Sequence, residues 1–541
     1  MTWRLRDVVW SAGVLGRSGL MGPWLPDQLL GMGLSLARYG PSVAAHYAVG
    51  AARSSRQAAV IDEAGTLSFG ELDDRTTKVA DGLARAGVVE GDRVAVLCRN
   101  HRGFVQATVG LSKLGATAVF LNTGLAPPQL AEVVFREGCA AVIVDEDLLT
   151  AAGLMRPRVV RILSESVEAM ATRPGRCLPP VPDHSGGQTI LTSGTTGTPK
   201  GARLAGPSQV GPLLGILAAV PLRRRDVVYV APPLYHAWGF FHLVLAGVVG
   251  ETVVLRRRFD PEATLALIQE HRVTALAVVP VMLQRLLDLP EATRAAYDTS
   301  SLRVVVSSGA PLPGDLATRF MDTFGDVLYN LFGSTEVAWA TVASPADLRA
   351  APSTAGRPPR GTVVRLVGDD GAEVGTGAVG RILVENGLAF AGYTTGGSKP
   401  VLDGLMGTGD LGRFNDAGLL FVEGREDDMI VSGGENVYPG EVENLLLTHP
   451  GVAEACVVGV ADPEWGQRLR AYVVPRAGVS GAPAGVPTAE ALQDFVRGRL
   501  ARYQVPRDLV FVQELPYTTT GKVLRRVLAE ERVTKGPISS V

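Results

Sequence analysis

The sequence contains few cysteines and almost no net charge, and each of these scarcities argues against a class of protein. Its four cysteines are scattered and form no Cys-x-x-Cys pair, which argues against a disulfide framework or a zinc site and favours a reducing cytoplasm. The 52 basic and 54 acidic residues leave a formal net charge of −2, so no overall field attracts nucleic acid. No Gly-x-Ser-x-Gly motif occurs, which argues against a serine hydrolase of the nucleophile-elbow type.

The sequence also lacks a secretory signal and an uninterrupted apolar run at its start. Residues 1–40 are apolar but are broken by charged residues, among them Arg4, Arg6, Asp7, Arg17 and Asp27, and by Pro23 and Pro26, which excludes a membrane span of about 20 residues. Trp3, Trp10 and Trp24 lie near arginines. Two alternatives stay open for this segment: peripheral contact with a membrane, or packing on the protein's own surface.

What is present is a long chain with an alternating pattern. At 541 residues, with 46% hydrophobic and 20% charged residues, it is too long for one core, so we expect two or more domains. From Ala58 onward short apolar strands alternate with amphipathic helices, including helices over 103–114, 239–248 and 261–271. This rhythm predicts parallel sheets covered by helices. Near Gly361 shorter segments with turn signals predict a small β-barrel-like unit.

The stretch from Leu191 to Gly201 combines a β-branched lead-in with hydroxyls, glycines and a closing Pro199-Lys200-Gly201. Glycines let successive N–H groups point into one concavity, and the hydroxyls and Lys200 add donors and a charge, so the loop suits a polyphosphate. It is not a Walker A loop, because Pro199 precedes the lysine and no helix-opening Ser or Thr follows it.

Two later motifs extend this pattern. The segment Ser307–Leu312 follows an apolar strand, where parallel sheets place ligand loops. The segment Tyr329–Glu336 places a hydroxyl and a carboxylate after an aromatic platform. A phosphate-bound Mg²⁺ needs one or two protein carboxylates, and Glu336 fits that role.

The segment Thr192–Gly201 resembles the signature of the adenylate-forming superfamily, which includes acyl-CoA synthetases, peptide-synthetase adenylation domains and luciferases. The resemblance extends in order from about Tyr47 to Val527. It implies an α/β fold in which a large N-terminal domain of parallel-rich, helix-covered sheets carries a small β-barrel-like subdomain. A small, mobile α+β domain follows. The implied limits are an extension over 1–40, a large domain over 41–424 with the β-rich part at about 361–424, and a small domain over 425–541. The hinge falls at 424–428, with Asp427 at the hinge position.

The resemblance also implies roles for particular residues. Lys522 would bridge the substrate carboxylate and the α-phosphate, Thr335 would reach the α-phosphate, and Asp410 with Arg425 would bind the ribose. Phe332 departs from the family, which often has Tyr there, so stacking on adenine survives while a phenolic hydrogen bond is lost. The remaining implied residues are catalytic Thr192, Lys200 and Glu336 (the Mg²⁺ ligand), phosphate-loop residues Ser193, Gly194, Thr195, Thr196 and Gly197, adenine-side residues Ser308, Gly309, Ala310, Pro311 and Gly333, and pantetheine-tunnel residues Gly433 and Gly434.

The segment around His236, Trp238 and Gly239 is expected to wall the acyl pocket. Its apolar surroundings favour an alkyl chain, and no carboxylate is present there to bind an amino acid's ammonium group. We therefore predict an ATP-dependent fatty acid–CoA ligase that uses Mg²⁺ and coenzyme A. Alternatives are an acyl-AMP ligase that loads a carrier protein, a CoA ligase for an aromatic or short-chain acid and, from another class, an inactive binding module. A homodimer is an open alternative too.

Overall fold

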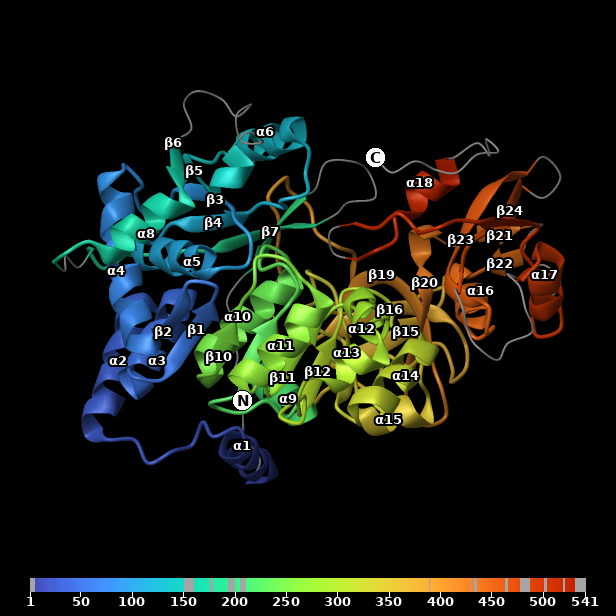
Figure 1. The fold of residues 1–541 in the computed structure, drawn as a ribbon, viewed down its shortest axis with the longest axis horizontal. Coiled ribbons are helices and arrows are strands. Elements are labelled where there is room, and N and C mark those ends of the chain that lie inside the picture. Colours follow the sequence, from blue (N-terminus) through green and yellow to red (C-terminus); the bar gives the residue numbers. More distant parts are fainter. Residues whose placement is uncertain are drawn as a thin grey trace.

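The computed structural model describes residues 5–149, 160–175, 179–192, 200–204, 211–388, 390–428, 430–432, 435–462, 466–476, 487–500, 504–518 and 521–530. These described residues form two large sheets, a smaller antiparallel sheet and a separate C-terminal sheet (Figure 1). The α/β fold with a large N-terminal part and a smaller C-terminal part is confirmed.

The first large sheet has the strand order β17-β8-β7-β4-β3-β5-β6, with β3 to β7 parallel and β8 and β17 antiparallel at one edge. Its inner strands β3, β4 and β5 consist mainly of Val, Ala, Ile and Leu, as expected for strands buried on both faces. The central helix α5 is buried along its whole length. The strands are β3 (Arg93–Leu97), β4 (Thr117–Phe120), β5 (Ala141–Val144), β6 (Val160–Leu163), β7 (Gln188–Thr192), β8 (Lys200–Leu204) and β17 (Phe390–Tyr393); the helices are α3 (Val43–Ser54), α4 (Phe69–Arg85), α5 (Arg102–Leu114), α6 (Pro127–Arg136), η1 (Glu146–Leu148) and α8 (Ser164–Thr172).

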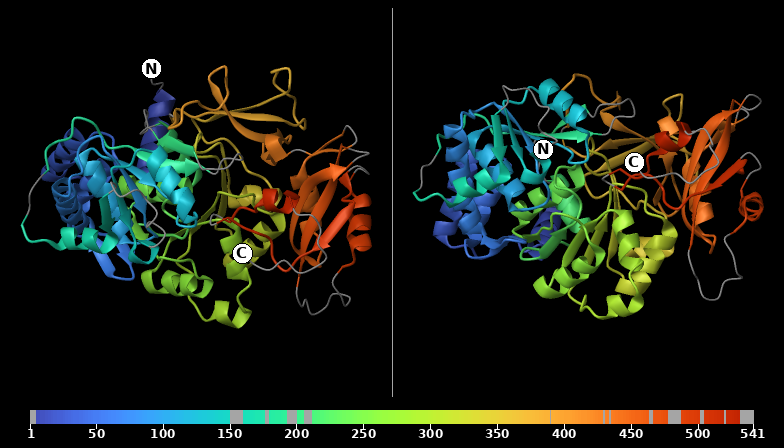
Figure 2. Two further views of the ribbon diagram at one scale, coloured as in Figure 1. Left: turned by 90° about the horizontal axis from the view of Figure 1, so that it is seen from above. Right: turned by 45° about the horizontal axis from the view of Figure 1, so that its top comes forward.

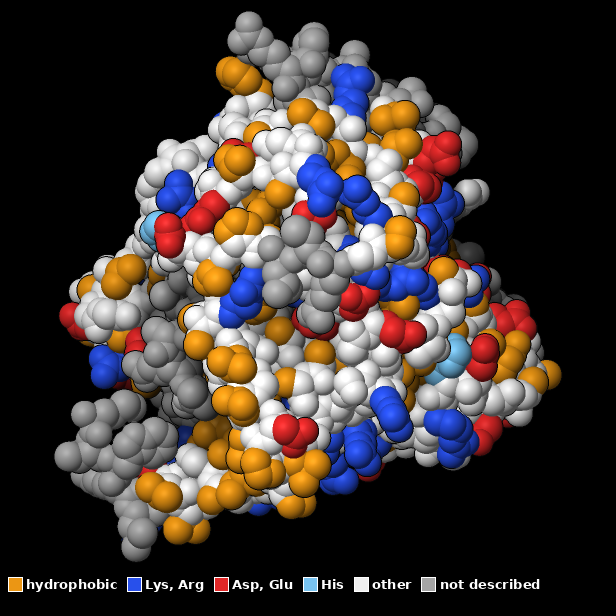
Figure 3. Space-filling model, turned by 90° about the vertical axis from the view of Figure 1, so that its left-hand side faces the viewer, with side chains coloured by type: hydrophobic (Ala, Val, Ile, Leu, Met, Phe, Trp, Pro, Cys, Tyr) orange, Lys and Arg blue, Asp and Glu red, His pale blue; other side chains and the backbone are white. Residues whose placement is uncertain are grey.

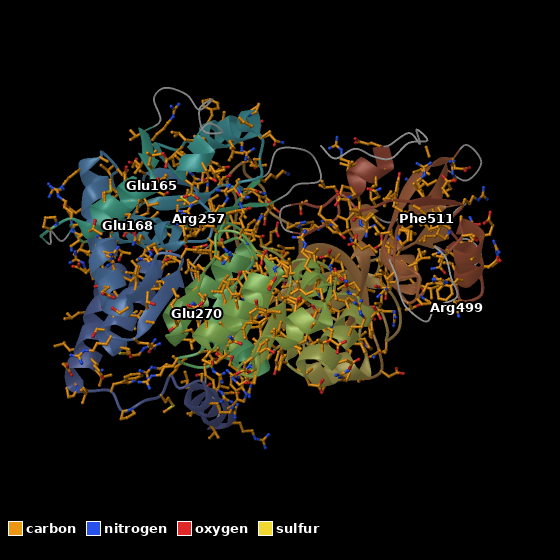
Figure 4. All side chains as sticks on the ribbon, in the orientation of Figure 1. Glu165, Glu168, Arg257, Glu270, Arg499 and Phe511 are labelled. Carbon is orange, nitrogen blue, oxygen red and sulfur yellow. The ribbon has the colours of Figure 1, made fainter. Side chains whose placement is uncertain are left out.

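Local signals explain where these helices begin. Ser68 and Glu71 form a capping box at the start of α4, in which the hydroxyl accepts from the Glu71 N–H and the carboxylate accepts from the Ser68 N–H. Glu168 of α8 forms an ion pair of 2.5 Å with Arg75 of α4, which ties the two helices together on this side of the sheet (Figure 4).

The second large sheet has the order β14-β13-β12-β11-β9-β10-β1-β2 and is parallel except at its two edge strands. The expected alternation of strands and helices is confirmed. The strands are β1 (Ala58–Asp62), β2 (Gly65–Ser68), β9 (Val227–Val230), β10 (Thr252–Val254), β11 (Ala275–Val278), β12 (Val304–Ser307), β13 (Leu328–Phe332) and β14 (Thr341–Ala343); the helices are α9 (Gly211–Ala219), α10 (Ala237–Val249), α11 (Pro261–His271), α12 (Pro280–Leu287), α13 (Glu291–Ala295), α14 (Gly314–Phe324) and α15 (Pro345–Ala350).

One helix boundary differs from the sequence expectation and matters for the site. Helix α10 begins at Ala237, not at residue 239, and His236 occupies its N-cap position. Gly239 in the first turn lets the helix approach the preceding loop, because a Cβ there would lie 2.3 Å from the Pro233 carbonyl oxygen. Trp238 therefore projects from the first helical turn.

The smaller antiparallel sheet lies in the region after residue 361 where the sequence predicts a β-rich unit. It contains β15 (Val363–Val367), β16 (Gly380–Glu385), β18 (Val401–Leu402), β19 (Leu405–Phe414) and β20 (Leu420–Arg425). Figure 2 shows this sheet and the C-terminal domain toward the same end of the molecule, away from α4.

The C-terminal domain packs helices against a sheet of order β22-β21-β24-β23, with β25 beside β24. Its own core includes Val442, Leu446, Val457, Leu469 and Leu492. Arg499 and Phe511 mark this domain in Figure 4. Its elements are η2 (Glu426–Asp428), β21 (Ile430–Ser432), β22 (Glu435–Val437), α16 (Pro439–Leu447), β23 (Val452–Asp462), β24 (Gly466–Pro475), α17 (Ala489–Arg497), β25 (Asp508–Phe511) and α18 (Arg525–Glu530).

The N-terminal extension forms α1 (Leu5–Arg17) and α2 (Pro26–Tyr39). Trp10 and Trp24 pack on the protein, since Arg360 lies 4.4 Å from the Trp10 ring centroid and Arg224 lies 4.8 Å from that of Trp24. Trp3 lies outside the described residues. The outward side of α2 is apolar nonetheless: Leu29, Leu30 and Leu34 are 52%, 65% and 62% exposed. Figure 3 shows hydrophobic side chains gathered on the lower part of the face that includes α2.

Within the part of the chain that is described, no helix combines the length and the hydrophobicity that crossing a bilayer requires.

Candidate active site

The phosphate-loop motif connects two antiparallel strands. Thr192 at the end of β7 pairs with Lys200 at the start of β8, and the Thr192 hydroxyl donates to the Lys200 carbonyl oxygen at 3.2 Å. Because a strand, β8, and not a helix begins at Lys200, the arrangement agrees with the expectation that this is not a Walker A loop. The predicted loop residues Ser193, Gly194, Thr195, Thr196 and Gly197 lie outside the described residues.

Tyr393 of β17 joins this hairpin to the predicted magnesium ligand. Its hydroxyl donates to Oε1 of Glu336 at 2.6 Å, and the Lys200 ammonium lies 5.8 Å from the centroid of its ring. Burial, followed by the hydrogen bond to Glu336, raises the pKa of Tyr393, so the hydroxyl stays protonated and remains a donor. Glu336 also lines a cleft of about 290 Å³ together with Glu385 and Asn386.

The sequence did not point to Tyr393. Its partner Glu336 lies 57 positions earlier, and β17 reaches it only because it pairs with β8 at the edge of the first sheet. No local motif around Gly392-Tyr393 carries that information.

The predicted adenine-side residues lie at the ends of neighbouring parallel strands. Ser308, Gly309, Ala310 and Pro311 follow β12, and Phe332 ends β13, which pairs with β12. Only glycine fits at position 333, because a Cβ there would lie 2.1 Å from the Ala338 carbonyl oxygen. Thr335 follows in the same half-buried turn. The topology therefore brings both segments to one edge of the second sheet, as expected for strand carboxyl ends.

Asp410 and Arg425 face each other across the antiparallel pair β19–β20. Nη1 of Arg425 lies 3.9 Å from Oδ1 of Asp410, and the Asp410 backbone N–H donates to the Thr408 hydroxyl at 3.0 Å. Burial raises the pKa of Asp410, while the charges of Arg425 and Lys522 oppose that rise. The structure thus brings the two predicted ribose ligands together.

Lys522 approaches this group from the C-terminal domain on a tight turn. Its N–H donates to the Thr518 hydroxyl at 3.0 Å, and the Thr518 N–H donates to the Lys522 carbonyl oxygen at 2.7 Å. Gly521 has φ of +75°, and a Cβ there would lie 2.7 Å from Cγ1 of Val281 on α12. The turn therefore rests on the N-terminal domain, at a position where only glycine fits without strain.

Charges from the large domain act on the Lys522 ammonium. Its side chain keeps contact with solvent, yet protein atoms crowd around the charged group. This partial desolvation lowers the pKa of Lys522, as does the charge of Arg425, while Asp410 and Glu336 raise it. Four side chains that the sequence predicted separately therefore form one electrostatic cluster.

The three predicted acyl-pocket residues lie at the start of α10. Burial, and then the charge of Lys522, lowers the pKa of His236 to about 3, so its ring is neutral at physiological pH. The Trp238 indole N–H donates to the Val278 carbonyl oxygen at 2.8 Å, which fixes the orientation of the ring. Trp238 stacks on Phe241 with ring centroids 5.9 Å apart and an interplanar angle of 10°.

Three further predicted residues fall wholly or partly outside the described part of the chain. Gly433 and Gly434 lie outside the described residues, and of Asp427 only the backbone is described, within η2.

Residues 48–394 match the AMP-binding enzyme family, and residues 441–522 match the AMP-binding enzyme C-terminal domain. The chain is 35% identical over 483 residues to a feruloyl-CoA synthase from Amycolatopsis sp., covering 88% of this chain and 96% of that protein. It is 28% identical over 477 residues to the long-chain-fatty-acid–CoA ligase FadD13 of Mycobacterium tuberculosis, covering 86% and 93%.

A solved structure with the same fold is the o-succinylbenzoate CoA synthetase of Bacillus subtilis in complex with its acyl-adenylate intermediate. The TM-score is 0.78 at 28% identity, and the match covers 90% of this chain and 98% of that one. The adenylate-forming resemblance of the sequence is thereby confirmed. The chain belongs to the AMP-binding enzyme family and is an adenylate-forming acid–CoA ligase.

Proposed function

We propose that this ligase activates an aromatic carboxylic acid with ATP and transfers the acyl group to coenzyme A. The observation that carries the chemistry is the cluster of Lys522 with Glu336, Asp410 and Arg425, in which a lysine from one domain meets the charged residues of the other. A cation held among acids at a domain boundary suits a reaction between two anions.

In this proposal Asp410 and Arg425 bind the ribose, Ser308 to Pro311 and Phe332 line the adenine, and Thr335 reaches the α-phosphate. Carboxylate oxygens accept hydrogen bonds from both ribose hydroxyls, which requires the ionised form of Asp410. The nearby charges of Arg425 and Lys522 favour that form. Lys200 and the residues of its loop bind the phosphates that leave.

Mg²⁺ fits the donor set at Glu336. Tyr393 holds one carboxylate oxygen, the other has no hydrogen-bond partner among the described residues and could bind a hard cation, and the adjoining cleft has room for water and phosphate ligands. Bound there, the ion would neutralise charge on the phosphates of ATP.

In the first step a carboxylate oxygen of the acid forms a bond to the α-phosphorus, and the bond from that phosphorus to pyrophosphate breaks. Both reacting groups are anionic, so their approach is opposed by repulsion. The Lys522 ammonium offsets this repulsion, most strongly when the bound substrates displace water from around it.

In the second step the thiol of coenzyme A attacks the acyl carbonyl and AMP leaves. This carbonyl is neutral, so the step does not need Lys522. We propose that the C-terminal domain rotates about residues 424–428, with Asp427 in the hinge, to bring Gly433 and Gly434 to the pantetheine arm. Gly521 packs closely against Val281 of the large domain, and such a rotation would break this contact.

The relatives favour an aromatic acid over a fatty acid as the substrate of this chain. The feruloyl-CoA synthase is 35% identical to this chain, against 28% for the long-chain-fatty-acid ligase. The pocket wall supports the same choice, because the rings of Trp238, Phe241 and His242 pack together there, and stacked rings bind flat aromatic groups well.

The test is a substrate panel assayed by AMP formation with ATP, Mg²⁺ and coenzyme A. We expect kcat/KM for aryl acids such as cinnamates and benzoate to exceed that for octanoate and palmitate. A higher kcat/KM for palmitate than for every aryl acid would restore the fatty acid assignment, and activity with a carrier protein in place of coenzyme A would favour an acyl-AMP ligase.

A further inference from the structure

Glu137 is a buried carboxylate that the reaction described above does not use. It directly follows the last turn of α6, and its side chain is fully buried. A negative charge at the C-terminal end of a helix opposes the helix dipole, and burying a charge costs free energy. Arg93 of β3 offsets part of this cost with an ion pair of 2.7 Å, and Arg136 lies 3.4 Å from the other carboxylate oxygen. The local structure of α6 alone gives no reason for a carboxylate at this position.

The same carboxylate accepts a hydrogen bond from a residue that lies 257 positions later in the chain. The Thr394 hydroxyl donates to Oε1 of Glu137 at 2.8 Å. The Thr394 N–H donates to the Gly201 carbonyl oxygen at 2.8 Å, so Thr394 is held at two points. Its neighbour in the chain is Tyr393, whose hydroxyl holds Glu336. The hydrogen bond to Glu137 therefore fixes the backbone directly beside the tyrosine.

Gly201, the last residue of the phosphate-loop motif, leaves the space that this hydrogen bond occupies. A Cβ at position 201 would lie 2.6 Å from the Thr394 hydroxyl oxygen and 2.9 Å from Oε1 of Glu137. Any other residue at this position would therefore push both groups out of place. Glycine keeps room for the hydrogen bond beside the strand that begins at Lys200.

The edge strand β17 needs such a support. It is four residues long, none of them is buried, and its pairing with β8 is irregular between Phe390 and Tyr393. Segments with few buried contacts open more readily than core strands. The hydrogen bond from Thr394 to Glu137 acts at the end of β17, where the Tyr393 hydroxyl reaches Glu336.

We propose that Glu137 is a positioning residue for adenylation. Through Thr394 it holds Tyr393 at the end of β17, and Tyr393 in turn holds the Glu336 carboxylate in the orientation that binds Mg²⁺. This inference rests on the proposed function, because it takes Glu336 as the ligand of Mg²⁺.

The experiment measures how tightly the full-length enzyme binds α,β-methylene-ATP, which cannot form an adenylate, by titration calorimetry with Mg²⁺ and again with EDTA. Replacing a group that orients a metal ligand costs about 10- to 100-fold, and Thr394 acts one contact further away. We therefore expect Thr394→Val to weaken binding about threefold with Mg²⁺ and to leave binding with EDTA unchanged. Thr394→Ser keeps the hydroxyl and should bind the analogue with Mg²⁺ as tightly as the wild type.

A double-mutant cycle separates an effect through Tyr393 from a general structural effect. In a Tyr393→Phe background Thr394→Val should add no further loss, because the link to Glu336 is already absent. The matched control is Thr252→Val. It removes a hydrogen bond of 2.7 Å from a buried threonine to the Ala58 carbonyl oxygen in the second sheet, and it should leave binding with Mg²⁺ unchanged.

Three results would each overturn the inference: unchanged binding with Mg²⁺ in Thr394→Val, equal losses with Mg²⁺ and with EDTA, or full additivity with Tyr393→Phe. Glu336→Gln checks the proposed function separately. If this variant binds the analogue with Mg²⁺ as tightly as the wild type, the proposed role of Glu336 fails, and the inference fails with it. If Glu336→Gln weakens binding and Thr394→Val does not, the inference alone fails.

Discussion

Removing the Tyr393 hydroxyl tests whether the position of Glu336 matters for adenylation. Tyr393→Phe deletes one oxygen and keeps the ring beneath Lys200. The lost hydrogen bond has an O–O distance of 2.6 Å, in the range of charge-assisted bonds. Such bonds contribute about 1.5–3 kcal/mol. Because Tyr393 and Glu336 are both half-buried, the lower end applies, which corresponds to about a tenfold effect.

The assay is ATP–pyrophosphate exchange measured across a range of Mg²⁺ concentrations. We expect Tyr393→Phe to lose about tenfold at limiting Mg²⁺ and less at saturation, because a misplaced carboxylate holds the ion more weakly. Tyr297→Phe is the matched control, since that hydroxyl donates to Glu262 at 3.0 Å on the exposed surface. Wild-type exchange by Tyr393→Phe at limiting Mg²⁺, or an equal loss in the control, would refute the reasoning.

Further predictions concern the cation, its turn, the pocket wall and the N-terminal surface. The pKa of Lys522 is lowered below its ordinary value of 10.5, and the side chain is a cation only below that lowered pKa. As the pH rises, kcat/KM for adenylation should therefore begin to fall before pH 10.5. A profile that stays flat up to pH 10.5 contradicts this expectation. Gly521→Ala should slow exchange about tenfold and spare thioester formation from synthetic aryl-AMP, whereas Gly371→Ala, at φ of +79° in open space, should leave both rates unchanged. Trp238→Ala should change the ranking of acids by about 1–3 kcal/mol without changing the KM for ATP, and a common loss for all acids would make Trp238 structural. If the α2 surface contacts membranes, replacing Leu29, Leu30 and Leu34 by Ser should weaken cosedimentation with anionic vesicles by at least about tenfold. Replacing the exposed Val363 and Val401 by Ser is the control and should not weaken it. Unchanged cosedimentation of the leucine variant favours the alternative that the segment only packs on the protein.

The sequence predicted most elements of the large domain because their signals are local. A strand such as Ala275–Val278 is a continuous apolar run, and helix Pro261–His271 begins after an Asp260 cap with Pro at its first position. The start of α10 was less clear, because the ring-rich segment after His236 has neither an acidic first turn nor a charged face.

The site could be predicted only where its residues belong to motifs. Glu336, Asp410 and Lys522 each follow glycine-containing segments that resemble the family, and the structure brings them together. Tyr393 carries no such signal. Its role depends on the edge pairing of β17 with β8.

The central claim is that the chain joins an aromatic acid to coenzyme A through an acyl-adenylate. Its most direct test is a competition in which equal concentrations of 4-hydroxycinnamate, benzoate, octanoate and palmitate react with ATP and Mg²⁺, followed by mass spectrometry of the products. The account predicts that an aryl-AMP accumulates when coenzyme A is omitted, and that it is replaced by the aryl-CoA thioester and AMP when coenzyme A is added. Palmitoyl-CoA in excess of every aryl-CoA, or a thioester formed without any detectable adenylate, would contradict it.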